Sequence, residues 1–141
     1  MIFLLFLPLA ACAKGAPCGR LTVRVLDGFT ERPIEGARVT VPEAGVSLLT
    51  DACGETESMR VPVISDREYD RLLPSPSGRA TLIVTAPGYT PYLLLYARIV
   101  PESGRRIDAL LFPADGSMDV FPVIEAPDEG WCGELVRKFA K

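Results

Sequence analysis

The sequence predicts an all-β protein, a seven-stranded β-sandwich of Greek-key type with a short C-terminal tail or helix. Three features support this fold class. Apolar and polar residues alternate in short runs, as in strands buried on one face. Gly, Pro and Asp separate the runs at regular spacing, which is typical of β-sandwiches and barrels. Only residues 134–140 show the spacing of apolar side chains that indicates a helix.

The first strand illustrates the alternation. Leu21, Val23 and Val25 are apolar, whereas the residues between them are polar. Asp27 and Gly28 then break the pattern. The predicted strands run from Arg20 to this break and then over residues 37–41, 46–50, 57–63, 79–85, 92–99 and 106–112.

Residues 65–78 interrupt this regular series with a charged segment followed by Pro and Ser. Such a stretch predicts a long surface loop, and long loops in compact domains are often functional. Asp66, Glu68 and Asp70 alternate there and could supply oxygen ligands to a hard cation such as calcium. We favour solvated surface charge for these residues, and we expect no cofactor.

The chain divides into three predicted segments: residues 1–18, a lipoprotein signal segment and linker; residues 19–113, the sandwich; and residues 114–141, a Pro-rich acidic tail with a short amphipathic end. Trp131, Leu135, Val136 and Phe139 supply apolar anchors near the C-terminus. The preferred interpretation is a tail that covers an exposed sheet edge, which would otherwise invite aggregation. The alternative is a docking segment for a partner.

The N-terminus is an apolar run, Met1 to Ala11, with no charged side chain. It is too short to cross a bilayer as an ordinary helix, but it has the length of the apolar region of a signal peptide. Leu9-Ala10-Ala11-Cys12 resembles a bacterial lipobox, in which Cys12 would carry the lipid. A basic residue before the run is missing, although signal peptides normally have one, and this argues against export. On the strength of the apolar run and the lipobox we expect a lipid-anchored or secreted envelope protein. The alternative is a cytoplasmic protein with a misassigned start.

Three further cysteines are Cys18, Cys53 and Cys132, and no C-x-x-C pair occurs. This spacing gives no support for a zinc or thioredoxin-type site. In an exported chain a disulfide between Cys18 and Cys53 is our preferred pairing, because the first lies before a strand and the second in a turn. The alternative is three unrelated thiols.

The composition removes most enzyme classes. The chain contains no His, Asn or Gln. Without His it cannot build a Ser-His-Asp or Cys-His nucleophile, nor a His-ligated zinc or iron site. A net charge of −3 gives no basic face for nucleic acid. We therefore expect a protein that is not an enzyme, has no catalytic or metal-binding residues and does not bind nucleic acid.

Several turn motifs occur in a fixed order. A Pro-x-x-Gly-Ala-x-Val motif is followed by Thr-Asp-x-x-Gly and later by Ala-Pro-Gly-Tyr before another strand. In this order and spacing they resemble the carboxypeptidase regulatory-like domain, a member of the transthyretin-like (prealbumin-like) sandwich group. The matching turn residues are Pro33, Gly36, Ala37, Asp51, Gly54, Pro87 and Gly88.

The resemblance covers roughly residues 19–113 and implies an accessory folding or interaction module without catalytic residues. Enzymes of related architecture, the 5-hydroxyisourate hydrolases and intradiol dioxygenases, depend on His, which this chain lacks. We expect a module at the bacterial cell envelope or surface that binds a protein partner or supports an assembly. The alternative is a carbohydrate- or cell-wall-binding sandwich.

Overall fold

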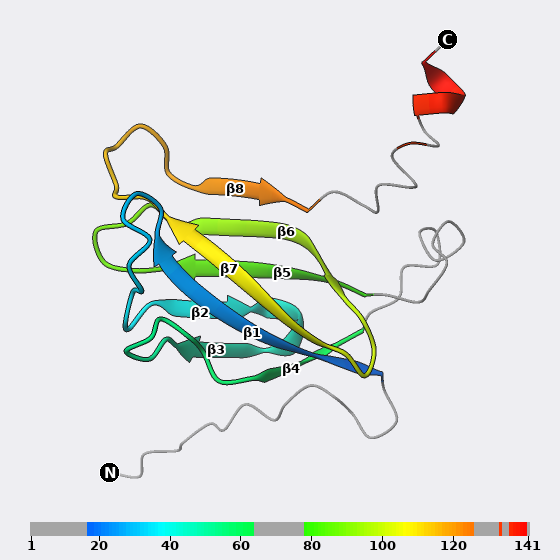
Figure 1. The fold of residues 1–141 in the computed structure, drawn as a ribbon, viewed down its shortest axis with the longest axis horizontal. Coiled ribbons are helices and arrows are strands. Elements are labelled where there is room, and N and C mark those ends of the chain that lie inside the picture. The colour runs from blue at the N-terminus through cyan, green and yellow to red at the C-terminus, as the bar shows by residue number, and fades with distance from the viewer. Residues whose placement is uncertain (1–16, 64–77, 126–132, 134–135, 141) are drawn as a thin grey trace, which may run out of the picture.

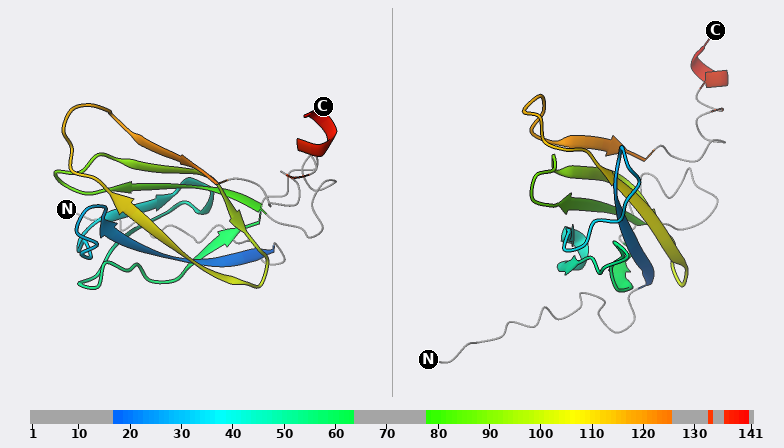
Figure 2. Two further views of the ribbon diagram at one scale, coloured as in Figure 1. Left: turned by 45° about the horizontal axis from the view of Figure 1, so that its top comes forward. Right: turned by 60° about the vertical axis from the view of Figure 1, so that its left-hand side comes forward.

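The computed structural model describes residues 17–63, 78–125, 133 and 136–140. Two sheets pack face to face (Figures 1 and 2). The smaller sheet has the order β4-β1-β7, with β1 Cys18–Asp27, β4 Met59–Pro62 and β7 Gly104–Leu111. The larger sheet has the order β3-β2-β5-β6-β8, with β2 Arg38–Val41, β3 Val46–Leu49, β5 Gly78–Thr85, β6 Tyr92–Ile99 and β8 Phe121–Ile124. The predicted β-sandwich is confirmed.

The core lies between the two sheets because successive side chains of a strand point to opposite faces. In β1 the apolar residues of the alternating run, Leu21, Val23 and Val25, are all fully buried. The larger sheet buries Val39, Leu82 and Val84 against them. A short 3₁₀ turn, η1 Pro42–Ala44, ends β2 and adds the buried Ala44 to this core.

The described residues form eight strands, one more than the sequence predicted. The additional strand, β8, lies in the predicted tail and pairs in parallel with β6, with Tyr92 opposite Phe121. It has only four residues and contains Pro122, which breaks the usual sequence signature of a strand. Proline is tolerated here because β8 is the edge strand of its sheet. Residues 121–124 of the tail thus cover an edge, as the preferred interpretation requires.

The C-terminal end is helical in its described part, namely Gly133 and residues 136–139. Val136 and Phe139 were expected to anchor the tail, but their exposed fractions are 63% and 71%. These two residues therefore do not pack as anchors. Trp131 and Leu135 lie outside the described residues, as do residues 65–77 of the predicted loop with the Asp66, Glu68 and Asp70 set.

Strand β6 contains a bulge opposite Thr81. Ala80 faces Ala97 and Leu82 faces Leu94, so two residues of β6 oppose one of β5. Tyr96 adopts a φ of 61° there, which is unusual for a bulky residue. The amide of Thr81 donates to both carboxylate oxygens of Glu43 at 3.0 Å. The Glu43 side chain thus satisfies a backbone donor that the bulge leaves without a ladder partner.

The turn that contains Asp51 and Gly54 follows β3. One carboxylate oxygen of Asp51 accepts the amides of Cys53 and Glu55 at 2.9 and 3.0 Å. These are the contacts of an Asx-type turn. Gly54 has a φ of 74°, and a Cβ atom there would lie 2.6 Å from the Val25 carbonyl oxygen. Both the backbone conformation and the available space therefore require glycine.

The other turn residues of the motifs have structural roles as well. Pro33 forms an isolated bridge with Leu26 of β1. Gly36 and Gly88 have positive φ angles of 73° and 81°, whereas Pro87 is exposed beside Gly88. Ala37 is fully buried and donates its amide to the Thr50 hydroxyl at 2.9 Å.

The predicted pairing of Cys18 with Cys53 is wrong. Cys18 is in a disulfide, but Cys53 is a free, exposed thiol. The partner of Cys18 lies outside the described residues. Cys53 lies in the turn after β3, whereas Cys18 begins β1, so the two occupy opposite ends of the sandwich. Sequence position alone could not reveal this separation.

Candidate functional site

Four connections meet at one end of the sandwich: β1–β2, β3–β4, β5–β6 and β7–β8, on the left in Figure 1. Strand β1 begins at the opposite end, next to the β6–β7 turn. The two ends of the sandwich therefore differ, because four connections meet at one and β1 begins at the other.

A row of aromatic rings runs through the loop end. Tyr92 stacks on Phe121 with ring centroids 6.5 Å apart, and Phe121 lies 5.3 Å from Phe112. Phe112 meets Phe29 edge to face at 5.2 Å. Tyr92 is only 6% exposed, whereas Phe29 is 75% exposed. The row thus connects the core to a phenyl ring that lies largely in solvent.

The carboxylate of Asp27 holds Phe29 in place. Its Oδ1 atom accepts the amides of Phe29 and Thr30, both at 2.9 Å. Its Oδ2 atom accepts the Tyr89 hydroxyl at 2.8 Å. These bonds lower the pKa of Asp27, with the Thr30 amide as the largest cause, and the same carboxylate raises the pKa of Tyr89.

Gly28 allows the close approach of Phe112 to this loop. A Cβ atom on Gly28 would lie 2.3 Å from the Phe112 ring, which is much closer than two carbon atoms can approach. Sequence reasoning interpreted Asp27-Gly28 only as the end of a strand. The signal that it missed is an acidic residue two positions before an aromatic one, the spacing at which an Asp side chain bonds to its own turn.

Other exposed apolar side chains lie at the same end: Leu110 of β7, and Met118 and Val120 of the β7–β8 connection, with exposed fractions of 40%, 48% and 40%. Together with Phe29 and Phe112 we call them the apolar end. A hollow next to Leu110 is lined by Leu26, Pro33 and Cys53 and also by three charged residues, Arg24, Glu31 and Asp108. Apolar groups exposed around an ordered aromatic residue are typical of a surface that contacts another protein.

The outer face of the smaller sheet carries ion pairs in its middle. Arg24 binds Asp108 through two bonds, Nε to Oδ1 at 3.0 Å and Nη2 to Oδ2 at 2.6 Å. Arg106 pairs with Glu55 and lies 3.7 Å from the same Asp108. Two arginines and two carboxylates thus neutralise one another.

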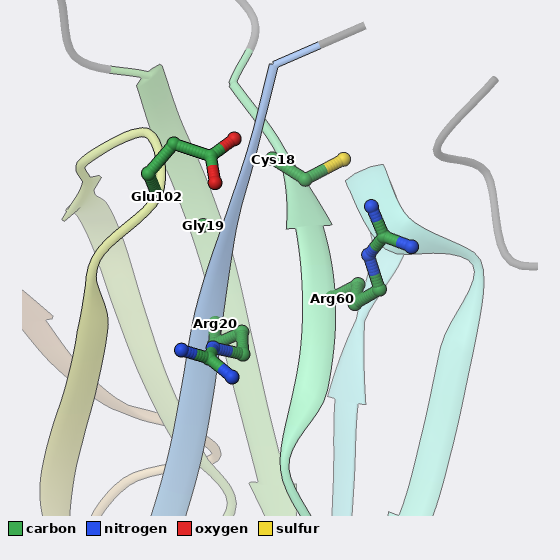
Figure 3. Close-up of a pocket in the computed structure, with 5 residues that line it drawn as sticks. All are labelled: Cys18, Gly19, Arg20, Arg60 and Glu102. Carbon is green, nitrogen blue, oxygen red and sulfur yellow. The ribbon is translucent and has the colours of Figure 1, made fainter. Parts of the chain in front are cut away.

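Nearer the point where the chain enters, the same face carries Arg20 and Arg60. They are directly opposite each other on β1 and β4. Figure 3 shows both beside a shallow hollow that Cys18, Gly19 and Glu102 also line. Of the ion pairs formed within the described part of the chain, none involves Arg20 or Arg60.

The structure does not gather the residues singled out in the sequence into one site. Cys12, the predicted lipidation position, lies outside the described residues. The turn residues belong to three of the connections that meet at one end of the sandwich, where they have structural roles. Within the described ranges, no three His, Cys, Asp or Glu side chains lie close enough together to hold a metal ion, and no helix is long and apolar enough to cross a membrane.

No protein-family model matches this chain, and no curated protein matches it. Solved structures do. Catechol 1,2-dioxygenase from Acinetobacter sp. ADP1 is 12% identical, with a TM-score of 0.50 over 83% of this chain and 59% of its own. A chain of a type II cohesin–X-dockerin complex from Acetivibrio cellulolyticus is 14% identical, with a TM-score of 0.47 over 71% of this chain and 61% of its own. The Bacillus anthracis TIE protein is 12% identical, with a TM-score of 0.47 over 69% of this chain and 17% of its own.

The chain spans less than two thirds of the length of each of these structures. At such low identity the likeness concerns the fold alone. The match to the dioxygenase supports the β-sandwich architecture and carries no activity with it.

Proposed function

We propose that the protein is a non-enzymatic accessory module of the bacterial cell envelope or surface, and that it binds a protein partner through the apolar end. The observation that carries this proposal is Phe29, whose side chain is 75% exposed although Asp27 binds its backbone amide and Phe112 contacts its ring. An aromatic side chain that is ordered before binding loses little conformational entropy on contact. Burying its ring would supply roughly 2–3 kcal/mol.

The family and the location belong to the same proposal. The ordered turn motifs resemble the carboxypeptidase regulatory-like domain, whose members accompany larger extracytoplasmic proteins. The apolar run before Cys12 supports export and lipid anchoring. The absence of His disfavours the chemistry of enzymes with related folds, because the chain has no imidazole to act as base or ligand.

Photo-crosslinking in the native host tests the proposal. A photoreactive phenylalanine analogue replaces Phe29 in one variant and Ile124 in the control. Ile124 is 65% exposed at the end of β8 that is remote from the four connections. We expect a defined protein adduct from position 29 only. Equal adducts from both positions, or none from position 29, would contradict a partner at this end.

A point substitution then measures the contact with the crosslinked partner. Phe29→Ala removes the exposed ring, and we expect affinity to fall at least tenfold with an almost unchanged melting temperature. Gly28→Ala displaces the supporting Phe112 ring and should weaken the same contact. Unchanged affinity in Phe29→Ala would show that the Phe29 ring does not contribute to the interface.

A carbohydrate- or cell-wall-binding sandwich is the alternative. Tyr96 favours it, because its ring is 55% exposed and its backbone has the positive φ of a strained bulge. Exposed aromatic rings of this kind stack on sugars. Binding of isolated peptidoglycan that Tyr96→Ala abolishes and Phe29→Ala leaves intact would establish this alternative.

A further inference from the structure

Arg20 and Arg60 form a like-charged pair at the end where the chain enters the sandwich. In an antiparallel sheet, directly opposite residues have Cβ atoms about 4.5–5.5 Å apart, and like charges at such positions are unfavourable. Both side chains are exposed. The fold therefore places two exposed cations at directly opposite positions, an arrangement that is electrostatically unfavourable without a counter-charge.

The neighbouring carboxylates do not neutralise this pair. Asp108 and Glu55 are engaged by Arg24 and Arg106 further along the face. Glu102 lines the same hollow, but neither arginine lies within ion-pair distance of it in the described part of the chain. Among the residues that line this hollow, two guanidinium groups and one carboxylate leave a net positive charge.

The position of the pair indicates what it faces. The Pro17 carbonyl accepts the amide of Val63 at 2.9 Å, which fixes the start of the described chain beside β4. Cys12 precedes Cys18 by six positions, and six extended residues span at most about 20 Å. A chain held to a membrane at or before Cys12 would therefore keep Arg20 and Arg60 close to the headgroups.

We propose that Arg20 and Arg60 bind the phosphate groups of an anionic bilayer and so orient the sandwich with its apolar end away from the membrane. This inference rests on the proposed function, because it uses the membrane attachment suggested for the N-terminal segment. Guanidinium groups suit phosphate because they donate parallel N–H bonds. Each basic residue near an anionic membrane surface strengthens attachment several-fold.

The test is co-sedimentation of the full-length chain with vesicles of phosphatidylcholine alone or of phosphatidylcholine and phosphatidylglycerol at 3:1. The lipid concentration is set so that about half of the protein sediments with the neutral vesicles. We expect a stronger partition to the anionic vesicles at low salt, lost at high salt. In the double variant Arg20→Gln/Arg60→Gln, the partition coefficient on anionic vesicles at low salt should fall about tenfold.

Two matched variants make the test specific. Arg32→Gln/Arg38→Gln removes the same charge from the β1–β2 connection and β2, and it should behave as the wild type. Glu102→Gln removes the nearby carboxylate and should bind anionic vesicles more strongly than the wild type. If the protein fails to sediment with neutral vesicles, the anionic vesicles alone still report on the arginine pair.

Equal partition of the wild type to both kinds of vesicle would overturn the proposal. So would an Arg20→Gln/Arg60→Gln variant that prefers anionic vesicles as strongly as the wild type does. A polyglutamate peptide is the competing ligand. Its binding without any gain on anionic vesicles would assign the pair to an acidic polypeptide instead. The vesicle assay contains no protein partner, so its outcome is independent of crosslinking at Phe29.

Discussion

Asp27 shows how one side chain can order a loop. Its two oxygens accept three hydrogen bonds, from the Phe29 and Thr30 amides and the Tyr89 hydroxyl. All three stabilise the ionised form, so the pKa of Asp27 is lower in the folded protein than in the unfolded chain. The backbone at Phe29 and Thr30 is thus linked to the charge of one carboxylate.

The order of the β1–β2 loop should depend on pH in the acid range. Because the folded pKa is depressed, the stabilisation is fully present above the unfolded value of about 4 and is lost as the pH falls through the folded pKa. We expect the Phe29 and Thr30 amide resonances to move together below pH 4 in an NMR titration. Asp27→Asn should show this shifted spectrum at neutral pH. Invariant amide positions down to pH 2 would contradict the linkage.

Two glycines with similar backbone angles should tolerate alanine differently. At Gly54 a Cβ atom would meet the Val25 carbonyl oxygen at 2.6 Å, whereas at Gly88 the space is open. Gly88→Ala then adds only the strain of a positive φ, about 1 kcal/mol. Gly54→Ala adds a backbone clash and should lower the free energy of unfolding by about 2 kcal/mol or more. Urea denaturation of both variants compares them, and equal losses would show that the clash relaxes.

At the level of elements, β8 covers β6, which would otherwise be an edge strand. It leaves β6 with partners on both sides, and its Phe121 and Val123 side chains pack against the core. Its alternate residues, Pro122 and Ile124, face solvent. The short strand thus caps an eight-residue strand that would otherwise present unpaired backbone groups.

Disrupting β8 should cause association of the protein. Val123→Asp buries a carboxylate against the core, so we expect β8 to detach and the molecule to oligomerise through β6. Ile124→Asp adds the same charge at a position that is 65% exposed and should remain monomeric. Sedimentation velocity over a tenfold concentration range distinguishes the two. A monomeric Val123→Asp protein would mean that disrupting β8 does not cause association through β6.

The strands and turns differ in how far sequence could predict them. Runs such as Leu21-Thr22-Val23 encode burial by alternation, and the seven strands that show it are all present. Strand β8 was missed because Pro122 lies in its centre and its stability comes from pairing with β6. The Arg20–Arg60 pair was missed because register is a property of two strands, which neither sequence segment contains alone.

For the molecule as a whole, the oxidation state of Cys18 and Cys53 tests the arrangement of the two ends of the sandwich. Cys53 is exposed and free, whereas Cys18 is bonded. Alkylation without reduction should therefore label Cys53 and leave Cys18 unlabelled, and peptide mapping should find Cys18 in a disulfide peptide that lacks Cys53. Recovery of a Cys18–Cys53 peptide would require a different arrangement of the two ends.

The central pairing of β1 with β7 joins the beginning of the sandwich to its last long strand, with Arg24 and Asp108 lying 84 positions apart. In the described part of the chain, β7 is the strand that pairs with this side of β1. A growing chain therefore cannot complete the smaller sheet until β7 has left the ribosome, and such long-range contacts form slowly. This order of synthesis would suit a chain that must cross a membrane unfolded. Because β7 is synthesised late, the smaller sheet is completed late, and the topology itself delays premature folding.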